Sequence, residues 1–188
     1  MAFRIYLSGS MAGRSPDQVK AERDHASEQF KKAGMMAVDP GAAEKKLWKK
    51  GKKARIALKF PRPIIDAFVK EDLWLIRRCD ALLVMTGDTP SDGTWWEMAY
   101  AEKIEIPIVM IAPRRAYGEL VGWSNIKVKY IVDDLPSAIR LIKKHFLKEY
   151  NRHKAYFDSA IRHAKTPIAD SVIHEKRKAK KRLTKHHR

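Results

Sequence analysis

The sequence is poor in cysteine and in acidic residues, and it has no long hydrophobic run. Because Cys79 is the single cysteine, it cannot form an internal disulfide, and we expect it to pack in the core rather than react. No apolar stretch reaches the ~20 residues that a membrane-spanning helix needs, and the apolar stretch at the N-terminus is too short for a signal peptide. These absences predict a cytoplasmic protein with no membrane partner.

Signatures of a metal or an organic cofactor are also missing. The seven histidines are scattered or terminal, and no two of them have the spacing of a zinc-binding helix with a third ligand. The glycines after the first apolar segment match neither the dinucleotide fingerprint nor a Walker loop. No serine elbow or cysteine-histidine arrangement stands out. We therefore expect neither a metal nor another cofactor.

The shortage of acids leaves a net charge of +17, and the excess is concentrated in two segments. Residues 151–188 hold twelve Lys or Arg against three acids, and eight more basic residues lie between Lys45 and Lys59. Lysine and arginine that neutralise phosphates bind nucleic acid in a salt-sensitive, sequence-independent way. The basic tail is therefore a candidate for nonspecific nucleic-acid contact, although a merely solvated tail explains its charge equally well.

Apolar runs alternate with helical patterns along most of the chain. Five segments read as strands, and the intervening patterns read as helices that begin near Ser15, Pro61, Gly93 and Pro136. The expected strands are 3–7, 35–38, 81–85, 106–111 and 128–132. Parallel neighbours need helical crossovers, so this order predicts an α/β, flavodoxin-like or Rossmann-like three-layer sandwich with a five-stranded, mostly parallel sheet.

The length of 188 residues allows one domain with a remainder. We expect a catalytic domain over residues 1–150. A basic C-terminal extension over residues 151–188 should be partly helical and then disordered, because its last part has little that could form a core.

The stretch from Asp88 to Glu97 places turn-forming residues and a carboxylate directly after the apolar strand at 81–85. If a helix opens at Gly93, Glu97 lies in its first turn and faces the crevice where open α/β sheets bind ligands. Spacing alone leaves a second interpretation open, in which Glu97 merely complements the helix dipole.

A second candidate site follows the first strand. The residues Ser8-Gly9-Ser10 read as a tight glycine turn, and the loop continues through Gly13 to Arg14. Backbone N–H groups in such a turn can cradle an anion, and a guanidinium suits phosphate. Turns of this kind are often only structural, so by itself the pattern is a weak signal.

Asp72 is a further carboxylate of interest, in the helix that precedes the strand at 81–85. Most such acids are solvated, but the apolar neighbours of Asp72 favour a partly buried position. A buried carboxyl keeps its proton more readily, as a general acid must. If Asp72 faces Glu97 across the crevice, the two could share the work as glycosidase carboxylates do.

Four short motifs together resemble the nucleoside 2-deoxyribosyltransferase family over residues 3–145. The motifs stand in the order and at the intervals of that family. They are Ile5-Tyr6-Leu7-Ser8-Gly9-Ser10, Glu71-Asp72-Leu73 with Asp80 after it, Pro90-Ser91-Asp92-Gly93-Thr94-Trp95-Trp96-Glu97-Met98-Ala99, and Ile106-Pro107-Ile108. The resemblance implies that Glu97 is the nucleophile at the anomeric carbon, that Tyr6 positions it or the sugar, and that Asp72 assists the departing base.

Within the family, the sequence is most similar to the nucleoside 5′-monophosphate N-hydrolase branch. Ser91 falls on the phosphate-contacting serine of that branch, and the loop from Ser8 to Arg14 resembles its glycine-serine loop. The resemblance therefore implies that the 5′-phosphate is held by Ser91 and by the loop residues Ser8, Gly9, Ser10, Gly13 and Arg14. Asp92, Gly93 and Trp96 are expected to contact the substrate too. The bulky pair Trp95-Trp96 departs from the smaller residues usual before the glutamate.

The expected activity is hydrolysis of the N-glycosidic bond of a nucleoside 5′-monophosphate, releasing the free base and ribose or deoxyribose 5-phosphate. One alternative is a transferase that passes the sugar from the same Glu97 intermediate to another base. Another is a non-catalytic module that binds nucleotides or nucleic acid through the basic tail. The resemblance also implies a homodimer or a larger homo-oligomer with shared sites, in which Ser91 acts across the interface.

Overall fold

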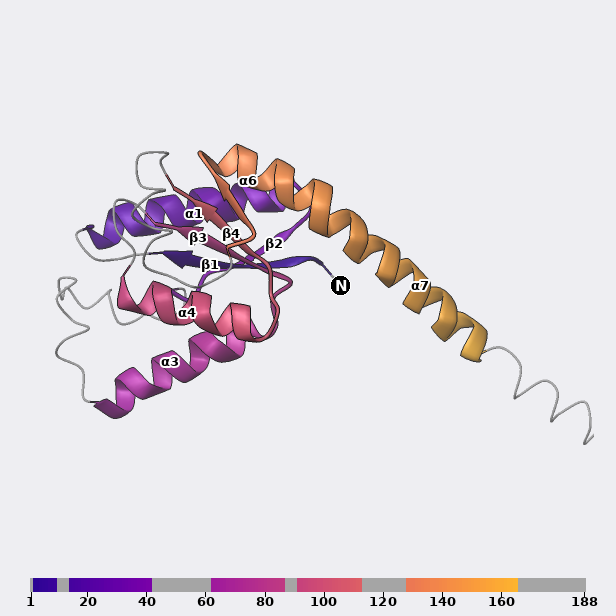
Figure 1. Cartoon of the computed structure of the whole chain (residues 1–188), viewed down its shortest axis with the longest axis horizontal. Helices are drawn as coiled ribbons and strands as arrows, with labels where there is room; N and C mark the ends of the chain where they lie inside the picture. The colour runs from indigo at the N-terminus through magenta and orange to yellow at the C-terminus, as the bar shows by residue number, and fades with distance from the viewer. Residues whose placement is uncertain (1, 10–13, 42–61, 87–90, 113–127, 166–188) are drawn as a thin grey trace, which may run out of the picture. The chain divides into compact units, whose positions relative to one another are not determined.

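The computed structural model describes residues 2–9, 14–41, 62–86, 91–112 and 128–165 (Figure 1). The chain separates into two compact units, Met1–Lys144 and His145–Arg188. The lysine-rich segment 45–59, the loop residues Ser10 and Gly13, and the basic residues after 165 lie outside the described residues. Predictions that concern these segments stay predictions.

The larger unit is built on a parallel sheet. Its described strands run in the order β2-β1-β3-β4-β5, and every neighbouring pair is parallel. The strands are β1 (Arg4–Gly9), β2 (Met36–Val38), β3 (Ala81–Met85), β4 (Ile108–Ile111) and β5 (Tyr130–Val132). This strand order is that of a flavodoxin-like doubly wound sheet, and it confirms the predicted α/β fold.

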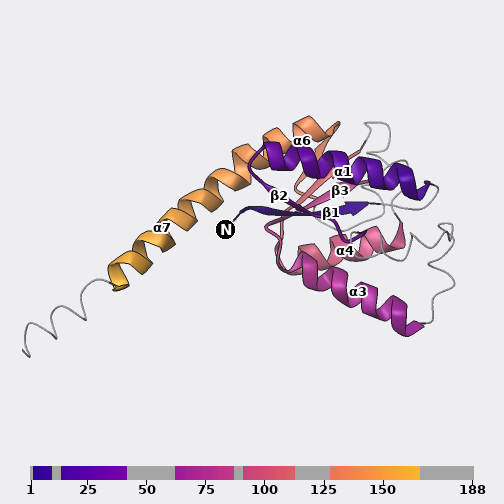
Figure 2. The same ribbon diagram turned by 180° about the vertical axis from the view of Figure 1, so that it is seen from behind.

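Helices cover both faces of this sheet. Helices α1 (Pro16–Lys32) and α6 (Leu135–Ile142) pack on one face, and α3 (Arg62–Ile76) and α4 (Asp92–Lys103) lie on the other. Figure 2 shows the same arrangement from behind. The architecture is therefore the three-layer sandwich that the alternation of strands and helices predicts.

The sheet separates two apolar layers because side chains alternate along each strand. Tyr6, Leu82 and Val84 point into the layer beneath α3 and α4, where they meet Ile76 and Met98. Side chains of opposite parity, such as those of Ile5, Leu7 and Leu83, are fully buried toward the face of α1 and α6. Burial on both faces explains why β3 is an unbroken apolar run rather than an alternating one.

Cys79 occupies the position that the sequence predicts. It is buried just before β3, and burial together with the nearby Asp80 carboxylate raises the pKa of its thiol to about 12. A thiol with so high a pKa is a poor nucleophile at neutral pH. Cys79 therefore serves in packing.

The helix that the sequence places at 136–150 is longer and more complex than expected. After α6, the chain forms a π-helical segment over Lys143–Leu147 and then α7 (Lys148–Lys165). Helix α7 runs through residue 150, where we expected the catalytic domain to end. The domain boundary at residue 150 therefore stays a prediction. Among the described residues, no helix is long and apolar enough to cross a membrane.

The glycine turn predicted at Ser8-Gly9-Ser10 is wrong in its first two residues. Ser8 and Gly9 continue strand β1 and pair with Val84 and Met85 of β3. A Cβ atom on Gly9 would lie 2.6 Å from the carbonyl oxygen of Met85, closer than real Cβ contacts come. Gly9 is therefore required by the close approach of two central strands, whatever else it does.

We expect Gly9→Ala to destabilise the protein by about 1–3 kcal/mol, the usual cost of overpacking a core. Gly93→Ala is the matched control, because a Cβ there meets nothing nearer than the Ser91 hydroxyl at 3.8 Å and alanine favours helix. The measurement is urea unfolding of both variants. Equal stability of the two variants would contradict the steric argument.

Candidate active site

Helix α4 begins at Asp92, and Ser91 is its N-cap residue. The Ser91 hydroxyl accepts a hydrogen bond from the backbone N–H of Thr94 at 3.4 Å, which satisfies one of the free donors at the helix start. The first-turn acid is therefore Asp92, and Glu97 lies in the second turn. This corrects the expectation that Glu97 is a first-turn residue, and it removes the interpretation of Glu97 as a dipole-complementing acid.

The Glu97 carboxyl group reaches from α4 to strand β1. The Tyr6 hydroxyl donates to its Oε1 at 2.7 Å, and the Ser8 hydroxyl donates to its Oε2. Tyr6 and Ser8 are fully buried, so neither donor can move far. Each oxygen of an ionised carboxylate has two lone-pair directions, so each keeps one for another partner. The carboxylate is thus fixed in orientation, and each of its oxygens can still accept a hydrogen bond or contact a ligand.

Burial sets the electrostatics of this pair. Removal from water raises the pKa of the Glu97 carboxyl, and the hydrogen bonds from Ser8 and Tyr6 and the positive charge of Arg23 lower it in part. Burial and the nearby carboxylates of Glu97 and Asp72 raise the pKa of the Tyr6 hydroxyl far above its usual value. The Tyr6 hydroxyl therefore keeps its proton at neutral pH and remains a hydrogen-bond donor.

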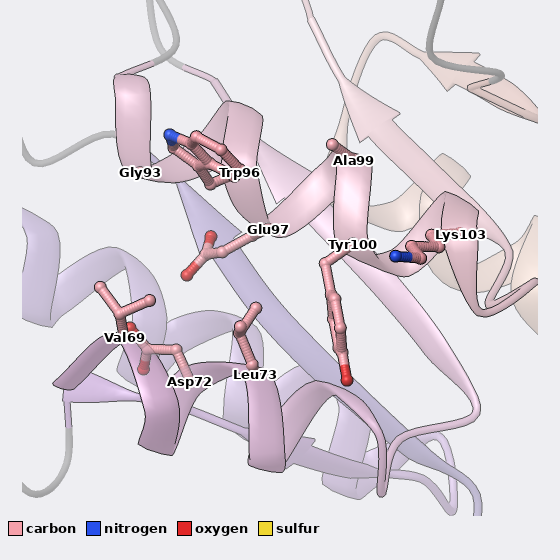
Figure 3. Close-up of a pocket in the computed structure, with 9 residues that line it drawn as sticks. All are labelled: Val69, Asp72, Leu73, Gly93, Trp96, Glu97, Ala99, Tyr100 and Lys103. Carbon is pink, nitrogen blue, oxygen red and sulfur yellow. The ribbon is translucent and has the colours of Figure 1, made fainter. Parts of the chain in front are cut away.

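A pocket of about 530 Å³ opens beside Glu97, between α3 and α4. Figure 3 shows the carboxyl groups of Glu97 and Asp72 projecting into the space between the two helices. The residues that line it are Val69, Asp72, Leu73, Gly93, Trp96, Glu97, Ala99, Tyr100 and Lys103. The volume is in the range of small-molecule sites, and the lining combines apolar walls with a few ionisable groups, as such sites usually do.

The two neighbouring tryptophans have different positions. Trp95 packs against the core beneath α4, whereas Trp96 is 74% exposed and lines the pocket. An exposed indole at the opening of a pocket offers a flat apolar surface to a ligand. Trp96 is thus placed where a substrate contact is possible, and Trp95 has a structural position.

The residues that we expect to hold a phosphate are less closely grouped. Ser91 caps α4, Asp92 and Gly93 form its first turn, and Gly93 lines the pocket. The Arg14 guanidinium is 2.7 Å from the Glu22 carboxylate, so its charge is already paired. The Ser8 hydroxyl donates to Glu97. Ser10 and Gly13 lie outside the described residues, so a complete phosphate cradle stays a prediction.

A buried ion pair joins Arg23 of α1 to Asp39, the residue after β2, and it was not predicted from the sequence. The Arg23 Nη1 atom lies 2.9 Å from Asp39 Oδ1. The signal was present in the spacing, because Arg23 shares a helical stripe with the buried residues Val19, Ala26 and Phe30. A charged residue in an apolar stripe indicates a specific partner or role.

Within the described ranges, no group of three or more His, Cys, Asp or Glu side chains is placed to hold a metal ion. The acidic groups near the pocket are Asp72 and Glu97, and one comes from each of the two helices. Their arrangement suits acid and nucleophile chemistry on an organic ligand.

The chain belongs to a family known as a domain of unknown function, DUF4406, whose model matches residues 3–110. No curated protein matches the chain. The solved structures that are similar to it include BlsM and a CMP N-glycosidase. The solution structure of BlsM is 23% identical with a TM-score of 0.48, and the match covers 74% of this chain and 86% of that one. The structure of the Clostridium botulinum CMP N-glycosidase BcmB is 19% identical with a TM-score of 0.45, covering 76% and 99%.

Replacing Glu97 by Gln should make the protein more stable at neutral pH. A raised pKa means that the folded state favours the uncharged carboxyl, so its contribution to stability is present below the unfolded pKa and is lost as pH rises through the folded one. Glu97→Gln keeps the uncharged form at all pH values, and the Ser8 hydroxyl can rotate to accept from the new amide.

The measurement is the melting temperature of both proteins between pH 4 and pH 8. We expect the variant to melt higher at pH 8 and the difference to vanish toward pH 4. A difference that does not change with pH would show that the charge of Glu97 costs the fold nothing. Glu28→Gln is the control, because the hydrogen bond and charge of Lys32 lower the pKa of the Glu28 carboxyl, so removing its charge should give no gain at pH 8.

Proposed function

We propose that the protein hydrolyses the N-glycosidic bond of a nucleoside 5′-monophosphate, with Glu97 as the nucleophile. The observation that carries the proposal is the Glu97 carboxylate, held by the Tyr6 and Ser8 hydroxyls at a pocket that Asp72 also lines. The motif resemblance to the nucleoside 2-deoxyribosyltransferase family supplies the substrate class. The family of unknown function to which the chain belongs leaves this activity open.

In the first step, a Glu97 oxygen forms a bond to the anomeric carbon as the N-glycosidic bond breaks. The electron pair of that bond goes to the base nitrogen, and Asp72 supplies a proton to the departing base. The transition state resembles an oxocarbenium ion, so a fixed carboxylate at the anomeric carbon stabilises it. The desolvated Glu97 is suited to this role because its charge is held in a low-dielectric site.

In the second step, water attacks the anomeric carbon of the glycosyl-enzyme. Asp72, now ionised, accepts a proton from the water, and the bond to Glu97 breaks with its electron pair returning to the carboxylate. The products are the free base and the sugar 5-phosphate. If a second base attacks in place of water, the same intermediate gives the transferase reaction, so one assay with and without an acceptor base distinguishes the two.

The assignment of Ser8 changes in this scheme. Since its hydroxyl donates to Glu97, we assign Ser8 to positioning the nucleophile rather than to binding phosphate. Ser91 and the N-terminus of α4 then remain as the phosphate site, because free N–H groups and the helix dipole favour an anion there. Helix α4 would thus both bind the 5′-phosphate at its N-terminus and carry the nucleophile Glu97. A homodimer that completes this site, and a cytoplasmic location, stay predictions.

Replacing Glu97 by Ala should lower base release from nucleoside monophosphates by at least about 10³-fold, as loss of a covalent nucleophile does. Tyr6→Phe should lower it less, because it removes one of two hydrogen bonds to the carboxylate. Free base is measured by chromatography over a panel of common and modified nucleoside monophosphates. Circular dichroism confirms folding, and undiminished release by the folded Glu97→Ala variant would disprove the mechanism.

Replacing Ser91 by Asp tests the phosphate. Aspartate caps helices as well as serine, so the fold of α4 is kept while a negative charge is added at the expected phosphate position. We expect kcat/KM to fall by about tenfold or more for monophosphates but little for the corresponding nucleosides, since close like charges repel. Ser91→Asn is the uncharged capping control. An unchanged preference would remove the phosphate from the proposal.

A further inference from the structure

Arg23 is a buried cation on the core-facing side of α1. Only 6% of the residue is exposed, and it shares its helical stripe with the apolar residues Val19, Ala26 and Phe30. A leucine at this position would continue the apolar stripe without burying a charge. Buried ion pairs add little net stability, because desolvation offsets their attraction. The presence of a guanidinium here therefore calls for a role other than packing.

The guanidinium is fixed by a compact arrangement of neighbours. Arg23 Nη1 donates to Asp39 Oδ1 at 2.9 Å, and the backbone N–H of Gly41 donates to the same oxygen at 3.0 Å. A Cβ atom on Gly41 would lie 2.9 Å from Arg23 Nη1, so a side chain there would have to displace the guanidinium. Both charged side chains are at most 10% exposed. Arg23 thus has one defined orientation.

This ion pair lies at the carboxyl end of the strands, as does the Ser8 hydroxyl that contacts Glu97. Val38, the last residue of β2, pairs with Tyr6, so Asp39 follows beside the part of β1 that leads to Ser8. Tyr6 and Ser8 are the two residues that donate to Glu97. The positive charge of Arg23 acts on both ends of that contact, lowering the pKa of the Glu97 carboxyl and of the Tyr6 hydroxyl.

We propose that Arg23, held in place by Asp39, is a positioning residue that keeps the buried Glu97 carboxylate ionised. The groups that act on Glu97 come from three elements besides its own, and Arg23 does so from α1, which packs on the opposite face of the sheet. Strand β1 supplies the hydroxyls of Tyr6 and Ser8, α3 supplies the Asp72 carboxyl across the pocket, and α1 supplies the charge of Arg23. Among these, Arg23 is the cation, so it opposes the effect of burial at longer range than the two hydrogen bonds.

The effect on turnover rests on the proposed function, but the effect on the ionisation of Glu97 does not. The test therefore measures the titration of the Glu97 carboxyl carbon by NMR, assigned by the signal that disappears in Glu97→Gln. The main variant is R23M/D39N, which removes both buried charges and leaves neither one unpaired. Heteronuclear spectra confirm its fold, and R23Q/D39N, whose two amides can hydrogen-bond each other, is used if R23M/D39N does not fold.

Three further variants separate the role of the charge from that of the ion pair. Asp39→Asn keeps the guanidinium charge, Arg23→Lys keeps a cation without the planar fork, and K20M/D24N removes an exposed ion pair from the same helix. We expect the Glu97 pKa to rise in R23M/D39N. The Glu97 pKa should not rise in Asp39→Asn or K20M/D24N. In Arg23→Lys, the titration of Glu97 should stay close to that of the wild type.

An unchanged Glu97 titration in folded R23M/D39N would overturn the proposal and leave the pair as a tether between α1 and the end of β2. An equal rise in K20M/D24N would also overturn it, because the effect would not be specific to Arg23. If the protein releases base, the acid limb of its kcat/KM profile should move to higher pH in R23M/D39N. If it releases none, the proposed function fails while the NMR titration still decides the role of Arg23.

Discussion

The contact between Glu97 and strand β1 is the interaction on which the rest of the site depends. Its two hydrogen bonds join residues 91 and 89 positions apart in the sequence, from a helix and from the strand beside the centre of the sheet. They form only when β1 lies next to β3 and α4 follows β3 on the proper face. The doubly wound topology is therefore what turns three separate residues into one group with a defined orientation.

This contact also constrains the strands beneath it. Ser8 can reach Glu97 because β1 continues to Gly9 instead of turning, and that continuation brings Gly9 against the Met85 carbonyl. A larger residue at Gly9 would push β1 away from β3 and move the hydroxyls of Tyr6 and Ser8. A glycine that the sequence suggested as an anion cradle thus acts through the geometry of the sheet. The close approach of β1 to β3 at Gly9 is therefore also what places the Tyr6 and Ser8 hydroxyls at Glu97.

The sequence predicted the fold well because burial on both faces leaves a clear pattern. The run at 81–85 was located to the residue, since all five of its side chains are buried. Element ends were less certain. The start of α4 depends on the capping hydroxyl of Ser91, and a helix starting there moves Glu97 from the first turn to the second. Helix was expected on both sides of residue 150, but not the π-helical segment at Lys143–Leu147 or the unbroken run of α7 through residue 150.

The candidate site was predictable in part. The residue types of Glu97, Tyr6 and Asp72 and their order pointed to one crevice, but a sequence pattern does not show which groups form hydrogen bonds across it. Ser8 was therefore assigned to phosphate, and its hydrogen bond to Glu97 was not foreseen. Arg23 and Asp39 were missed for a related reason, because an ion pair between a helix and a strand end has no fixed spacing. The one indication in the sequence was the charge of Arg23 within the apolar stripe of its helix.

The electrostatics of the site combine opposing effects that neither the sequence nor a single contact reveals. Burial favours the protonated form of Glu97, whereas two hydroxyls and a buried guanidinium favour the ionised form. A nucleophile benefits from both, since desolvation keeps the carboxylate reactive and the donors keep it charged. The balance depends on distance, because hydrogen bonds act within about 3 Å while the charge of Arg23 acts through the protein interior. A mutation of Arg23 can therefore change the ionisation of Glu97 although Arg23 does not contact the ligand.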